Sequence, residues 1–81
     1  MVTVEQILEY LERRIAEHHL AGDRLALKRD QDVAGFLMAA VRDLGDKHLA
    51  LRFQVLAARA ADMREQLEKN VTTYPASKET G

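Results

Sequence analysis

The sequence predicts an all-α protein, either a three-helix bundle or a helical hairpin with a long C-terminal helix, completed by self-association. Three observations lead to this prediction. Apolar residues recur at helical spacing in three segments, and isolated glycines separate those segments. No strand-type alternation longer than three residues occurs anywhere in the chain.

The first predicted helix covers residues 4–20. Thr3 and Gln6 have the spacing of a capping box, which marks the start of a helix. Gly22 follows the last periodic residue and is expected to end the helix. The apolar stripe steps by four, three and four residues through Val4, Leu8, Leu11 and Ile15.

The second helix is predicted over residues 33–44, and its start is left open between two positions. Asp23 is able to cap a helix that begins at Arg24, whereas Asp30 or Asp32 is able to cap a later start, after the polar run 28–32. Gly35, four residues before Ala39, predicts a close approach of another helix. The expected buried face consists of Val33, Phe36, Leu37, Ala40, Val41 and Leu44.

The third predicted helix is the longest, over residues 48–71, after Gly45 and a capping Asp46. Residues 72–81 contain the only proline and no periodicity, so we expect a folded domain of residues 1–71 and a flexible tail of residues 72–81. The third helix carries an apolar seam with alternating spacings of four and three, made of Leu49, Phe53, Leu56, Ala60, Met63 and Leu67.

Small size predicts that this seam contacts a second chain. A domain of 81 residues buries a modest share of its surface, and domains this small usually need a disulfide, a metal or a partner for stability. This chain has no cysteine. If the second helix starts at Val33, the seam extends two or three turns beyond it, so Met63 and Leu67 should bury against a partner. A start at Arg24 instead allows a closed three-helix monomer. We therefore expect a homodimer, another protein partner, or both.

Composition narrows the class of protein. The chain has 12 basic and 13 acidic residues, so it shows no electrostatic preference for nucleic acid or an anionic membrane. Its longest apolar run, residues 36–41, is too short to span a bilayer, and no secretory leader pattern opens the chain. We expect a cytoplasmic protein without membrane contact. The excess of Arg over Lys is typical of GC-rich bacterial or phage genomes.

No residue pattern indicates catalysis, a metal or a cofactor. His18 and His19 are adjacent and therefore point in different directions, and we expect them to be surface residues at a helix C-terminus rather than zinc ligands. Residues 30–35 resemble the opening of a calcium loop, but Val41 stands where the loop requires an acidic ligand. The prediction is a non-enzymatic chain with no metal and no cofactor.

The predicted function is protein–protein interaction, as an adaptor, inhibitor or regulator that uses the seam. The alternative is a nucleic-acid-binding regulator of the helix-turn-helix type, formed by the second and third helices. In that alternative the phosphate contacts come from Lys47, Arg52 and Arg59, although Asp43, Asp46 and Asp62 dilute the basic patch.

Overall fold

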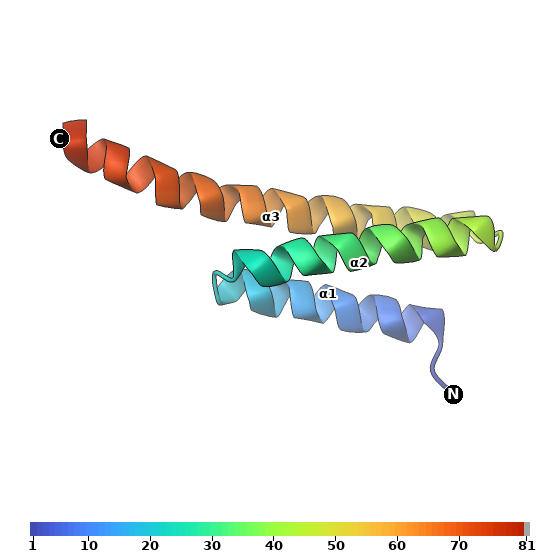
Figure 1. The fold of residues 1–81 in the computed structure, drawn as a ribbon. Coiled ribbons are helices and arrows are strands. Elements are labelled where there is room, and N and C mark those ends of the chain that lie inside the picture. Colours follow the sequence, from blue (N-terminus) through green and yellow to red (C-terminus); the bar gives the residue numbers. More distant parts are fainter. Residues whose placement is uncertain (81) are drawn as a thin grey trace.

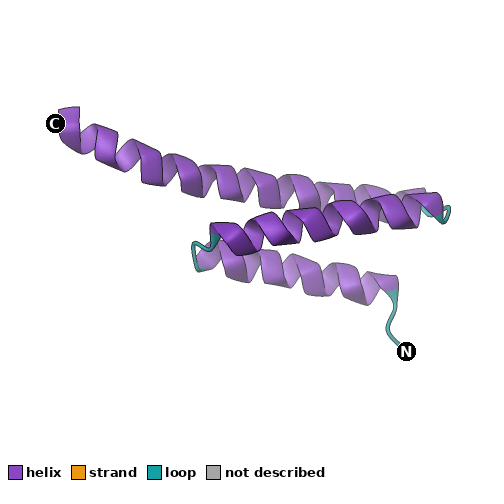
Figure 2. Ribbon diagram, in the orientation of Figure 1, coloured by secondary structure: helices purple, strands orange, loops and turns teal. Residues whose placement is uncertain are grey.

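Three helices joined by short turns form the fold, as a computed structural model shows (Figure 1). Helix α1 spans Val4–Leu20, α2 spans Arg24–Asp43 and α3 spans Lys47–Thr80. The structure describes the backbone of residues 1–80 and the side chains of residues 1–69. Within those residues there is no strand (Figure 2), so the predicted all-α class is confirmed.

The predicted capping of α1 is confirmed in detail. The backbone N–H of Gln6 donates to the Thr3 hydroxyl at 3.1 Å, and the Thr3 N–H donates to the Gln6 side chain at 2.9 Å. Gly22 follows the helix with a φ of +68°, a conformation that costs other residues free energy because their Cβ would clash. The sequence therefore sets both ends of α1 locally.

The start of α2, which the sequence left open, lies at Arg24. Asp23 occupies the N-cap, and its carboxylate accepts the N–H of Ala26 at 3.0 Å. The alternative in which Asp30 or Asp32 caps a later start does not hold, because both lie inside a helix that has already begun. With 20 residues, α2 is about 30 Å long and covers α3 much farther than a helix from Val33 would.

The core lies where the three helices meet. Helices α2 and α3 run side by side as an antiparallel hairpin with the most extensive contact of any pair, and α1 packs against both (Figure 1). This arrangement is a three-helix bundle. The buried apolar residues are Leu8, Leu11, Ile15, Leu27, Ala34, Val41, Ala50, Phe53, Leu56 and Ala60.

The face of α2 that enters the core differs from the predicted one. The buried line runs through Leu27, Asp30, Ala34 and Val41 at helical spacing. Of the predicted face, Val41 is buried and Leu37 is partly buried, but 72% of Phe36 and 86% of Leu44 are exposed. The predicted face of α2 was wrong because the polar residues 28–32 interrupt the apolar pattern in the first half of the face that is buried.

Gly35 does not mark a close helix crossing. A Cβ built at this position meets nothing within 4 Å, whether from side chains or from the backbone of another helix. The expected close approach is therefore wrong. The sequence signal, a glycine four residues from an alanine, does not mark a crossing here because no other part of the structure lies within 4 Å of that Cβ.

Helix α3 continues to Thr80, beyond its predicted end at residue 71. The backbone hydrogen-bond pattern of a helix does not depend on an apolar stripe. The end of the stripe therefore placed the predicted end of α3 too early. The side chains of the predicted tail, residues 72–81, lie outside the described residues, and the flexibility of that segment stays a prediction. In the described part of the chain, no helix combines the length and apolarity that crossing a membrane requires.

Candidate interaction surface

The predicted seam of α3 packs within its own chain. Phe53, Leu56 and Ala60 are at most 3% exposed and form the centre of the core. Leu49, Met63 and Leu67 are partly buried and pack against the same core. Because α2 begins at Arg24, the condition under which Met63 and Leu67 would overhang it is not met. A contact between the seam and a second chain stays an untested prediction.

The residues predicted to contact nucleic acid lie on α3, and all three are exposed: Lys47, Arg52 and Arg59. Arg59 is 3.7 Å from the carboxylate of Glu12, so part of its charge faces an acidic neighbour on α1. Helices α2 and α3 lie along one another (Figure 1), whereas a helix-turn-helix crosses its two helices at about 90–120°. The hairpin therefore does not present α3 as a recognition helix would be presented.

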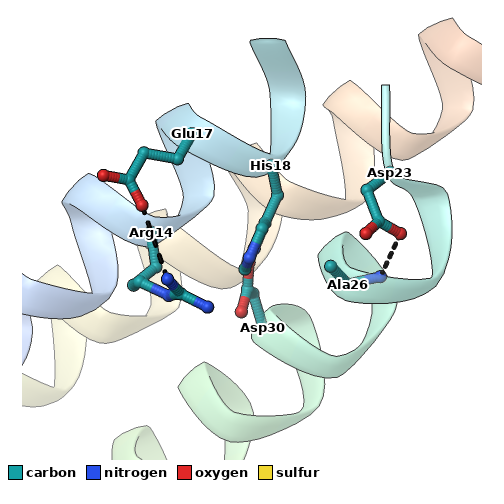
Figure 3. Close-up of polar contacts among 6 residues, drawn as sticks. All are labelled: Arg14, Glu17, His18, Asp23, Ala26 and Asp30. Carbon is teal, nitrogen blue, oxygen red and sulfur yellow. Dashed lines mark hydrogen bonds and ion pairs between the residues drawn. The ribbon is translucent and has the colours of Figure 1, made fainter. Parts of the chain in front are cut away.

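A polar pair that is largely buried joins α1 to α2. The ring Nδ1–H of His18 donates to the Asp30 carboxylate over 2.5 Å (Figure 3), with 17% and 10% of the two side chains exposed. His18 is thus not the surface residue that the sequence predicted. An imidazole oriented by a carboxylate also occurs in catalytic triads, but such a pair needs a nucleophile and a cleft beside it.

The surface hollows lie away from that pair. One is formed on α3 alone, by Val55, Ala58, Arg59, Ala61, Asp62 and Glu65. A smaller one lies between α1 and α3 and is lined by Leu8, Glu12, Arg52, Val55, Leu56 and Arg59. Neither of these two hollows is lined by His18 or Asp30, and the pair links α1 to α2. Among the described residues, no three His, Asp or Glu side chains gather as metal ligands.

An exposed face with apolar residues lies on α2, the helix in front of the other two in Figure 1. We define the outer face of α2 by residues whose spacings alternate between four and three: Arg29, Val33, Phe36, Ala40 and Asp43. Ala40 is partly buried, and the other four are exposed. Phe36 lies two residues from the buried Ala34, which is about 200° around the helix, so it points away from the core.

Sequence reasoning missed the outer face because it counted Val33 and Phe36 as core. One signal was present. Arg29 and Asp43 each lie seven residues from Phe36, which is two helical turns, so the three share one side of the helix. A side of a helix that carries two charged residues faces solvent more often than it faces the core.

Comparison with known proteins gives this chain no relative: no family model, no curated protein and no solved structure matches it.

Proposed function

We propose that this protein is a non-enzymatic protein–protein interaction module and that the outer face of α2 is its contact surface. The observation that carries the proposal is Phe36, which is 72% exposed in the middle of a regular helix. Burying a whole Phe side chain is worth about 1.5–3 kcal/mol, and this chain leaves most of that free energy unused.

The surroundings of Phe36 support contact with a protein. Val33 and Ala40, three residues before it and four after, extend the apolar surface along the helix. Leu44, 86% exposed, lies one turn beyond Ala40. Exposed apolar residues gathered on one element mark interaction sites more often than scattered ones do, and aromatic side chains supply much of the binding free energy at such sites.

This proposal moves the contact surface from the seam of α3 to α2. The core already uses the centre of the seam, and exposing Phe53 or Leu56 to a partner would require unfolding the bundle. An amphipathic helix whose second face is free matches the common mode in which one helix lies along another.

A photo-crosslinking amino acid tests the proposal. Benzoylphenylalanine in place of Phe36 keeps an aromatic ring at the surface, and the same replacement at the exposed Gln54 of α3 serves as the control. We expect irradiation to link position 36, and not position 54, to a protein identified by mass spectrometry. Equal products at both positions, or products that contain nucleic acid instead of protein, would contradict the proposal. Nucleic-acid products would favour the regulator alternative, whose binding should weaken steeply as salt rises.

A further inference from the structure

We propose that the partner of the outer face is a second copy of this chain, docked antiparallel across α2 about a twofold axis near Phe36. This inference rests on the proposed function, because it uses the same face. It adds the identity of the occupant and the orientation in which it docks.

The inference follows from the symmetry of charge around Phe36. A twofold axis places each residue opposite the one that lies equally far from the axis in the other direction. Arg29 lies seven residues before Phe36 and Asp43 seven residues after it, about 10.5 Å along the helix in each case. An antiparallel second copy therefore brings Arg29 to its Asp43, and Asp43 to its Arg29, so that both ends of the contact are closed by opposite charges.

Both charges are free to form such pairs. In the part of the chain that the structure describes, Arg29 takes part in no ion pair. Asp43 has only its neighbour Arg42, at 3.8 Å, and both side chains are more than half exposed. The flanking Lys28 and Asp32 differ, since they already pair with each other at 2.9 Å within α2. A twofold axis at Phe36 thus brings together Arg29, which has no ion pair among the described residues, and Asp43, whose contact with Arg42 is long and exposed.

The apolar residues have the spacing that such a contact needs. Val33, Phe36 and Ala40 follow the alternation of three and four along which paired helices pack. Ala40 is small and allows close approach, while Phe36 and Val33 supply the apolar area. A contact made by one helix per copy is small among stable interfaces, so we expect a weak, concentration-dependent dimer.

Charge reversal tests the orientation directly. Arg29→Asp places two aspartates opposite each other at both ends of the contact, and Asp43→Arg places two arginines there. Either single variant should weaken dimerisation by about tenfold or more in sedimentation equilibrium. The double variant Arg29→Asp/Asp43→Arg restores opposite charges and should return the dissociation constant to within a few-fold of the original.

Two controls accompany the series. Arg52→Asp changes the net charge as Arg29→Asp does but lies on α3, and it should leave dimerisation unchanged. Circular dichroism melting of each variant shows whether its bundle is folded, and because all three positions are exposed we expect it to be. A weakened dimer in a folded single variant, rescued in the double variant, supports the twofold contact.

Two results would overturn the inference: a chain that stays monomeric across about three decades of concentration, or a double variant no better than the single ones. Either result, together with crosslinking of position 36 to a different protein, removes the twofold contact and leaves the proposed function standing. Failure of the crosslinking as well would remove both.

Discussion

Asp30 is the residue at which the sequence is most misleading. It belongs to a polar run, yet it occupies a core position on α2 between Leu27 and Ala34. A buried carboxylate is tolerated only when it is paired or hydrogen-bonded, and here His18 of α1 provides the partner. The partner lies 12 residues away in the sequence, so no local pattern reveals it.

We predict that Asp30→Ala lowers the free energy of unfolding by about 1–3 kcal/mol, because the ring N–H of His18 is left buried without an acceptor. Urea denaturation measures the change. Asp32→Ala is the matched control: it removes an exposed carboxylate from the same helix and should cost no more than about 0.5 kcal/mol. Equal losses of unfolding free energy for the two variants would show that the pair with His18 does not stabilise the bundle more than an exposed ion pair does.

Glycine gives a second prediction at this scale. Gly35 lies inside α2 with open space where a Cβ would be, so Gly35→Ala should stabilise the bundle by about 0.5–1 kcal/mol, the helix-propensity difference. Gly22→Ala should do the reverse, since Gly22 has a φ of +68°. Thermal melting distinguishes them. A lower melting temperature for Gly35→Ala would reveal a contact that the fold does not show.

At the scale of elements, the sequence predicts α1 and the start of α3 well and α2 poorly. Thr3 and Asp46 cap the N-termini of α1 and α3, and Leu8 and Phe53 lie on uninterrupted apolar stripes. These signals are local, so they can be read without knowing the fold. Helix α2 has two candidate faces, and only its packing against α1 and α3 decides which one is buried.

The two phenylalanines test that assignment of faces. Phe53 is fully buried, so Phe53→Ala should cost about 3–5 kcal/mol, which is most of the stability of a small domain. Phe36→Ala should change the stability of the monomer by no more than about 0.5 kcal/mol, because Phe36 is largely exposed. Both should be measured in dilute protein, where any dimer has dissociated. Similar losses for the two variants would place Phe36 in the core.

At the scale of the whole molecule, the seam of α3 packs against the core of its own bundle, and the outer face of α2 is left uncovered. The sequence predicts that the chain associates, but it places the contact on α3, because a helix from Val33 would be too short to cover Met63 and Leu67. The true start at Arg24 removes that need. The proposed contact surface consequently depends on where one helix begins.

Disulfide trapping tests most directly whether copies meet through α2. The chain has no cysteine, so each introduced thiol is unique. A twofold axis near Phe36 brings Val33 close to Ala40 of the second copy. Like positions stay about 9 Å apart along the helix for residue 33 and about 12 Å for residue 40, farther than the Cα separation of a disulfide.

Val33→Cys chains mixed with Ala40→Cys chains should therefore form covalent heterodimers under mild oxidation, and far fewer homodimers when each variant is oxidised alone. Met63→Cys mixed with Leu67→Cys reports on the seam, and Leu51→Cys gives the rate of random collision. The account predicts efficient trapping only for the mixture of the position 33 and position 40 variants. Efficient trapping at positions 63 and 67, with collision-level products from positions 33 and 40, would contradict it.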